Sequence, residues 1–174
     1  MSAGRLVVLV DGSNVTHRVA RATSIDIADS QRLFVDQVCS WGAALGHDVI
    51  ITFDGAGPYG AGDRQVTPEV AVVGTGARDA DGVLEHRSRG LRKAGRRVWL
   101  VTDDVALRRV AGAGADRITS GSDFLELLQL DERQNRQAAT ERPVSAAPPR
   151  DTRVTDGLDP ATWAKLERLR RGDT

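Results

Sequence analysis

Apolar runs alternate with amphipathic segments along most of this chain. Residues 6–10 (LVVLV) are apolar at every position, which is typical of a central parallel strand covered on both faces. Similar runs predict further strands at 49–54, 70–74, 98–102 and 117–119. Strands that alternate with helical segments indicate an α/β fold with a mainly parallel sheet.

The segments between these runs carry a helical period. Phe34, Val38, Trp41 and Leu45 recur at steps of four, three and four, which places them on one face of a helix over 30–45. The pattern predicts further helices over about 80–94, 104–111 and 122–130.

The composition changes after residue 130. Residues 131–156 are rich in Arg, Gln, Glu, Ala and Pro without a core-forming period, which predicts a flexible linker. Residues 157–174 predict a short amphipathic helix with Trp163, Leu166 and Leu169 on one side. That side could dock in a partner's groove, or pack on its own domain or on a second copy, so a homo-oligomer remains open.

Composition and charge add broad limits. The chain has 174 residues, 40% of them hydrophobic and 28% charged, which suits one ordinary globular domain with an extension. The single cysteine, Cys39, excludes an internal disulfide framework and a cysteine-based zinc cluster. No apolar stretch has the length of a membrane span and no signal-peptide pattern is seen, so we expect a cytoplasmic protein without a membrane partner. The net charge of zero gives no general indication of nucleic acid.

Acidic residues stand at the ends of the predicted strands. These are Asp11, Asp54, Asp103 and Asp104 after strands, and Asp79 and Asp81 at the start of the helix that follows the third strand. In open α/β sheets, ligands bind beyond the carboxyl ends of the strands. Carboxylates gathered there repel one another unless cations neutralise them, and oxygen ligands suit Mg²⁺ or Mn²⁺.

Each acid also has a structural explanation. Asp11 before Gly-Ser-Asn can form an Asx-turn, Asp54-Gly55 is an ordinary turn dipeptide, and the remaining acids can cap helices. The repetition of acids at successive strand ends favours a functional cluster over separate turns and caps.

Four segments resemble a known family. VDGSNV, ITFDG, ARDADGVLEH and VTDDVALRRVAGAGADRITS are similar, in order and content, to the YacP-like branch of the NYN domain proteins, relatives of the PIN-domain nucleases. The similarity covers roughly residues 4–130 and makes 1–130 an NYN/PIN-like nuclease domain. It implies a PIN-like three-layer fold, with a mainly parallel five-stranded sheet of order 3-2-1-4-5 and helices on both faces. It also implies metal-dependent endoribonuclease activity.

The resemblance carries over to individual positions. The family's opening Asp-Gly-x-Asn is met by Asp11, Gly12 and Asn14, its helix start by Asp81 and Glu85, and its Thr-x-Asp by Thr102 and Asp104. The expected catalytic residues are Asp11, Asn14, Asp54, Asp81 and Asp104. The expected ligands of Mg²⁺ or Mn²⁺ are Asp11, Asp81 and Asp104, with Glu85, Asp103 and Asp79 as further candidates. Gly82 stands where a second acid is common, which puts a second metal in doubt.

A basic run, HRSRGLRKAGRR, occupies residues 86–97 without an acid. Such a run is often only a solvated helix face, but beside an acidic metal site it can bind the phosphates of RNA. The candidate RNA contacts are Arg18, Arg78, Arg87, Arg89, Arg92 and Lys93, with Arg21 also near the predicted site.

Two functions therefore remain in view. The first is a metal-dependent endoribonuclease that hydrolyses RNA phosphodiester bonds in RNA decay, processing or translation-linked quality control. The alternative is a non-catalytic PIN-like module that binds RNA or acts as a scaffold. A dinucleotide site is disfavoured, because Gly55, Gly57 and Gly60 form a G-x-G-x-x-G that Pro58 interrupts and no helical pattern follows.

Overall fold

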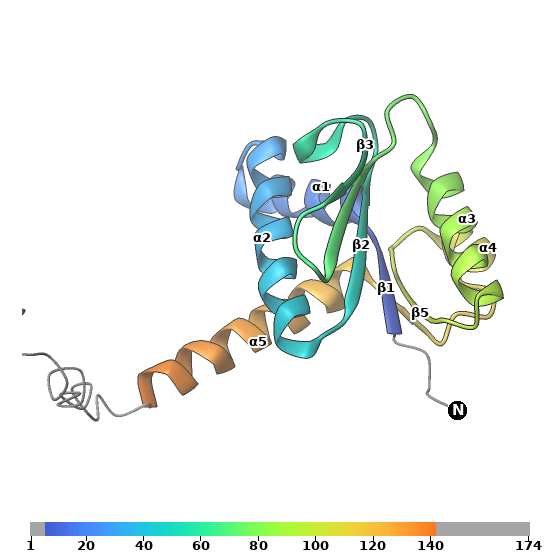
Figure 1. Ribbon diagram of the computed structural model, residues 1–174. Helices are drawn as coiled ribbons and strands as arrows, with labels where there is room; N and C mark the ends of the chain where they lie inside the picture. Colours follow the sequence, from blue (N-terminus) through green and yellow to red (C-terminus); the bar gives the residue numbers. More distant parts are fainter. Residues whose placement is uncertain (1–5, 142–174) are drawn as a thin grey trace, which may run out of the picture. The chain divides into compact units, whose positions relative to one another are not determined.

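The computed structural model describes residues 6–141, which contain a six-stranded sheet of order β3-β4-β2-β1-β5-β6 (Figure 1). Its strands are β1 (Leu6–Asp11), β2 (Asp48–Phe53), β3 (Gly62–Gln65), β4 (Val70–Gly74), β5 (Arg97–Val101) and β6 (Arg117–Thr119). All neighbours pair in parallel except β3, which is antiparallel to β4. The α/β class and the order of the five predicted strands are confirmed.

The sheet differs from the prediction by one strand, β3. Its residues, GDRQ, are all exposed at the edge of the sheet. A strand that buries neither face carries no apolar pattern, so periodicity gave no signal for it. The predicted count of five strands was therefore one too low.

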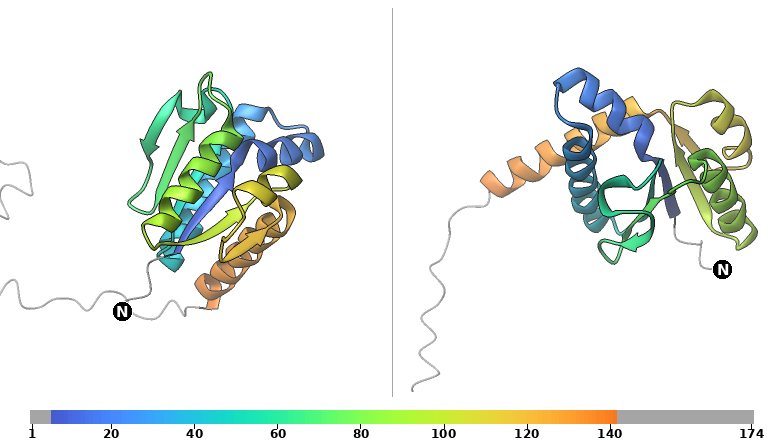
Figure 2. Two further views of the ribbon diagram at one scale, coloured as in Figure 1. Left: turned by 90° about the vertical axis from the view of Figure 1, so that its right-hand side faces the viewer. Right: turned by 90° about the horizontal axis from the view of Figure 1, so that it is seen from above.

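Helices cover both faces of the sheet. They are α1 (Gly12–Thr23), α2 (Ile27–Leu45), α3 (Ala80–Lys93), α4 (Val105–Val110) and α5 (Gly121–Glu141), with a short 3-10 helix, η1 (Gly57–Tyr59). Figure 2 shows α3 and α4 on one side of the sheet and α1 and α2 on the other. None of the helices within residues 6–141 is long and apolar enough to cross a membrane.

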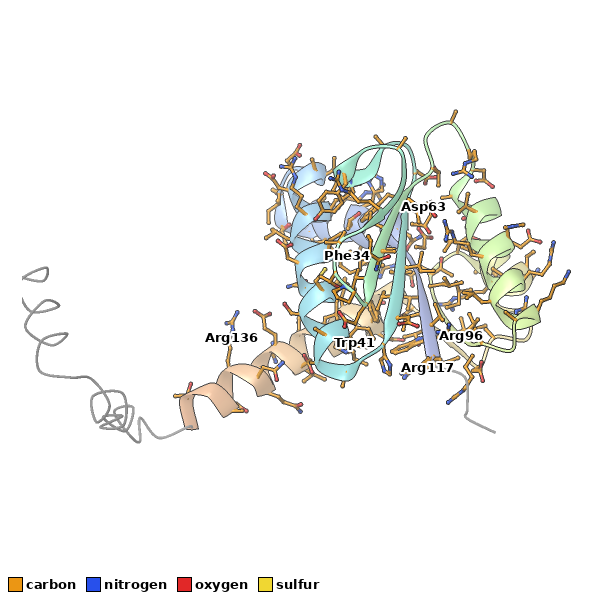
Figure 3. All side chains as sticks on the ribbon, viewed as in Figure 1. Phe34, Trp41, Asp63, Arg96, Arg117 and Arg136 are labelled. Atoms are coloured by element: carbon orange, nitrogen blue, oxygen red, sulfur yellow. The ribbon has the colours of Figure 1, made fainter. Side chains whose placement is uncertain are left out.

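Aromatic packing holds α2 and the start of α5 against the sheet. The Trp41 ring lies 5.3 Å from that of Phe124 and 5.8 Å from that of Trp99. Trp41 and Phe34 project from α2 into this layer (Figure 3). The predicted apolar stripe of α2 is buried except at Leu45, which is 51% exposed at the end of the helix.

Helix α1 was not predicted from the pattern. Most of its residues are polar, yet its first turn is buried against the sheet. A methyl group at Gly12 would come within 2.7 Å of side-chain atoms of Ile51 and Phe53, so only glycine permits this approach. Helix α2 begins at Ile27, where Asp26 rather than Ser30 caps it.

Helix α5 is longer than expected. Residues 131–141, assigned from sequence to the linker, continue the helix. The buried side chains of α5 end at Leu128, and polar pairs such as Asn135 with Asp131 lie beyond it. A helix stabilised in this way lacks the apolar period on which the prediction depended. The remainder of the predicted linker and the C-terminal helix of 157–174 lie outside the described residues.

Candidate active site

A cleft of about 810 Å³ opens at the carboxyl ends of the central strands. It is lined by Asp11, Ser13, Asn14, His17, Arg18, Arg21, Ala22, Asp54, Asp81 and Asp104. Parallel neighbours β2, β1 and β5 all end at this edge of the sheet. All five side chains expected to be catalytic therefore line one cleft, although they come from separate parts of the chain.

Asp11 stands at the base of this cleft and is only 6% exposed. It is the last residue of β1 and the N-cap of α1, so its Oδ1 accepts a hydrogen bond from the backbone N–H of Asn14 at 3.1 Å. Its Oδ2 accepts from the hydroxyl of Thr102 at 3.0 Å. Asp11 is thus a helix cap and a cleft residue at once, and the two interpretations of the sequence do not compete.

Thr102 connects two of the acids. Its hydroxyl donates to Asp11 and accepts from the backbone N–H of Asp104 at 3.1 Å. Asp104 caps α4, with Oδ1 accepting from the N–H of Leu107 at 2.8 Å. The Thr-x-Asp sequence therefore places Asp104 beside the end of β1 and fixes one of its two carboxylate oxygens.

Asp54 follows β2 and is exposed. Its backbone N–H donates to the hydroxyl of Ser13 at 2.8 Å, which ties the turn after β2 to the first turn of α1. Ser13 was not among the predicted site residues. A serine between Gly12 and Asn14 carries no catalytic pattern of its own, so only the fold reveals this contact.

The acids of the cleft affect one another's ionisation. Burial raises the pKa of Asp11, and the charges of Asp81 and Asp54 raise it further. Burial also raises the pKa of Asp81, and the charges of Asp79, Asp104 and Asp54 add to the effect. The cleft thus holds carboxylates whose ionised forms disfavour one another.

The donor chemistry of the cleft fits a hard divalent cation. Four carboxylates and the amide of Asn14 offer oxygen ligands of the kind that Mg²⁺ and Mn²⁺ prefer. Within residues 6–141, however, no three His, Cys, Asp or Glu side chains are already grouped closely enough to hold one ion. Hydrogen bonds engage both oxygens of Asp11 and one of Asp104.

A known family model matches most of the chain. The model of the YacP-like NYN domain covers residues 8–171. The chain belongs to the YacP-like NYN domain family. This membership, expected from the four sequence segments, is confirmed.

Solved structures agree with the family in fold. A crystal structure of a mutant of Rae1 (YacP) from Bacillus subtilis is 19% identical, with a TM-score of 0.62, and the match covers 96% of each chain. Another crystal structure of Rae1 (YacP) from Bacillus subtilis is 22% identical, with a TM-score of 0.60, over 96% of this chain and 95% of that chain. The T5 D15 protein, co-crystallised with metal ions, is a weaker match at 14% identity and a TM-score of 0.44, over 66% of this chain and 54% of that chain. No curated protein matches the sequence.

Three further candidate metal ligands of this YacP-like domain do not line the cleft. Asp79 caps α3 and accepts from the N–H of Gly82 at 2.9 Å. Glu85 pairs with Arg89 along the same helix. Asp103 pairs with Arg18 at 3.0 Å and accepts from the N–H of Gly121 at 3.2 Å, which joins α1 to the start of α5.

The structure places the predicted RNA-binding residues in different environments. Of the six, only Arg18 lines the cleft. Arg87 pairs with Asp63 of β3, and Arg92 donates to the backbone carbonyl of Ala113. Conversely, His17 lines the cleft although nothing in the sequence pattern distinguished it.

Proposed function

We propose that this protein is a metal-dependent endoribonuclease that hydrolyses phosphodiester bonds of RNA. The observation that carries the proposal is the buried carboxylate of Asp11, held at the mouth of the sheet with three other acids around one cleft. Membership of the NYN family and the PIN-like fold support a nuclease. Acids that raise one another's pKa are costly to maintain, and such groups gather at functional sites.

The residues of the cleft would divide the work between them. Asp11, Asp81 and Asp104 would hold the cation, and Asp54 would support it from the turn after β2. Mg²⁺ or Mn²⁺, when bound, supplies a Lewis acid that activates water and neutralises charge on the phosphate. Thr102 and the backbone of Asn14 fix the orientation of the Asp11 carboxylate. The Asn14 side chain lines the same cleft and would orient a phosphate oxygen or the attacking water.

One observation favours the alternative of a non-catalytic RNA-binding or scaffolding module. No three potential ligands within residues 6–141 are grouped ready for an ion. A binding module would keep Asp11 and Asp104 only as helix caps, a role that both already have. Isothermal calorimetry with Mn²⁺ separates the two functions, because a cap needs no metal whereas the nuclease must bind it.

The decisive test is cleavage of a mixed pool of single-stranded and structured RNA. Wild type, Asp11→Asn and Asp116→Asn are compared in Mg²⁺, in Mn²⁺ and in EDTA. Asp116 lies at the opposite end of the sheet and controls for the loss of one carboxylate. We expect metal-dependent cuts that vanish in EDTA and in Asp11→Asn but persist in Asp116→Asn. Cuts that survive Asp11→Asn would overturn the assignment of this site.

The biological setting that we propose is RNA decay, processing or translation-linked quality control. Docking of residues 157–174 on a ribosome or on the decay machinery belongs to the same proposal. Cleavage of cellular RNA by the full chain, compared with a chain that ends at residue 141, tests this. Equal cleavage patterns in cell extract would contradict a docking role.

A further inference from the structure

One face of α1 lines the cleft along its whole length. Asn14, His17, Arg18 and Arg21 are spaced by three, one and three residues, so they share one side of the helix, and all four border the cleft. Val15 and Thr16, on the other side, are buried. At 1.5 Å per residue, the stripe from residue 14 to residue 21 is about 10 Å long. That is the axial length of about three stacked nucleotides of one strand.

The charges of the cleft are separated by element. Its acids come from the ends of β1 and β2, the start of α3 and the N-cap of α4, whereas its basic side chains all come from α1. His17 and Arg21 are exposed, and no hydrogen bond or ion pair within residues 6–141 engages their side chains. The cleft therefore has acidic side chains at the strand ends and basic side chains along α1.

The side chain of Arg18 is held in place by residues outside the cleft. Its guanidinium pairs with Asp103 at 3.0 Å and lies 3.5 Å from the hydroxyl of Ser122. The side chain of Arg18 is still 53% exposed, whereas that of Asp103 is 19% exposed. The pairing thus orients the guanidinium without removing it from solvent.

The basic run on α3 has a different environment. Arg87 pairs with Asp63, Arg89 with Glu85, and Arg92 contacts the Ala113 carbonyl. None of these side chains borders the acidic cleft. Arg18 is paired as well, so what distinguishes the two sets is position: Arg18 borders the cleft and the α3 arginines do not.

We propose that the RNA strand beside the cleaved bond lies along α1, with its phosphates bound by His17, Arg18 and Arg21 and not by the basic run of α3. This inference rests on the proposed function, because it names the path of the substrate through the same cleft. Phosphate contacts carry no information about base sequence. The domain therefore binds RNA with little preference for sequence.

Arg21 has a competing explanation, which is stabilisation of the last turn of α1, because a cation there complements the helix dipole. That role changes the stability of the protein and leaves RNA affinity unchanged. The experiment therefore measures the two properties separately.

The probes are fluorescent 12-nucleotide oligouridine and oligoadenosine, and their binding to the full chain is measured by anisotropy in EDTA across a series of salt concentrations. EDTA prevents metal-dependent cleavage, so affinity is read without turnover. The variants are Arg21→Ala, Arg21→Lys and the double variant His17→Ala/Arg21→Ala. Arg109→Ala, an exposed arginine of α4 outside the cleft, is the matched control. Arg89→Ala/Lys93→Ala tests the competing path along α3.

We expect the double variant on α1 to bind both oligonucleotides about tenfold more weakly at low salt. The slope of log affinity against log salt should fall by about 0.7 in Arg21→Ala, the value for one phosphate contact on a single strand. Arg21→Lys should retain that slope, and Arg109→Ala and the α3 variant should bind like wild type. Thermal unfolding of each variant reports the helix-dipole role.

Loss of affinity in the α3 variant with none in the α1 variants would overturn the proposal, as would a strong preference for one oligonucleotide. An unchanged affinity in every variant would overturn it too. The test of the binding path is independent of the test of nuclease activity. If the α1 variants lose affinity but wild type cuts no RNA in Mg²⁺ or Mn²⁺, the binding path stands and the proposed catalysis fails.

Discussion

Carboxylates at the two ends of the sheet have opposite electrostatic environments. At the carboxyl ends of the strands, acids gather in one cleft, and burial and mutual repulsion raise the pKa of Asp11 and Asp81. At the amino ends, Asp48 pairs with Arg96, which Figure 3 labels at that end of the sheet. Asp116 accepts from the N–H of Val98 at 2.8 Å and contacts Arg97 at 3.2 Å, and these bonds lower its pKa.

The difference separates acids that the fold explains from acids that fit the proposed metal site. Asp116 accepts a hydrogen bond from the backbone of β5 and pairs with Arg97. Contacts within the fold are therefore enough to explain this carboxylate. Asp11 also caps a helix, but its ionised form is disfavoured by its surroundings. A fold gains nothing by gathering carboxylates without cations, whereas a site that binds a cation requires it.

The largest expected difference between the two ends of the sheet comes from removing one carboxylate at each end. We expect Asp11→Asn to lower the rate of RNA cleavage about 100-fold or more, equivalent to about 2.7 kcal/mol of transition-state stabilisation. Asp116→Asn should leave the rate within about twofold. Gel-based cleavage assays at a temperature where all proteins are folded measure both. Equal losses in the two variants would mean that the ends do not differ in function.

The next largest effect concerns how α1 reaches the acidic end. Gly12→Ala should destabilise the protein by about 1–3 kcal/mol, because the new methyl group overlaps Ile51 and Phe53. Gly90→Ala is the matched control, since open space surrounds that position on α3 and alanine favours a helix by up to about 1 kcal/mol. Urea denaturation gives both free energies of unfolding. A Gly12→Ala protein as stable as wild type would contradict the close approach.

A divalent cation should sharpen the contrast between the ends. At ten times its dissociation constant, Mg²⁺ or Mn²⁺ should stabilise the wild type by about 1.4 kcal/mol through binding to the folded state alone. Asp116→Asn should gain the same stabilisation and Asp11→Asn much less. Thermal unfolding over a metal titration measures the shift. A similar shift in Asp11→Asn would place the cation elsewhere.

The smallest effect is the dependence of stability on pH, measured in EDTA from about pH 4 to about pH 7. The raised pKa of Asp11 means that stability falls as pH rises through the range between its ordinary value and its folded value. Asp11→Asn should therefore gain stability relative to wild type as pH rises. Asp116 has a lowered pKa, so its contribution is present above its ordinary value and is lost as pH falls. The loss for Asp116 lies below its ordinary value of 3.8, so Asp116→Asn should run parallel to wild type across this range. A curve for Asp11→Asn that also ran parallel to wild type would contradict the direction given for Asp11.

Local patterns were sufficient where one face of an element is buried. The strand at Leu6–Asp11 and the stripe Phe34, Val38 and Trp41 are both apolar where they meet the core, and both were predicted. Strand β3 and the end of α5 bury too little for such a pattern, and both were missed. Helix α1 was missed for a related reason, since its exposed side is almost entirely polar.

The sequence by itself determined the family, the order of the main strands through the resemblance to that family, and the acids at the strand ends. Alternation of buried strands with helices allows few topologies, and parallel strands deliver the residues at their carboxyl ends to one edge of the sheet. Only the tertiary structure decided which charges share the cleft. It gave Asp79, Glu85 and Asp103 other partners, and it turned the stripe of α1 toward the acids. The direction in which a polar side chain points depends on contacts between distant segments, and those exist only once the chain is folded.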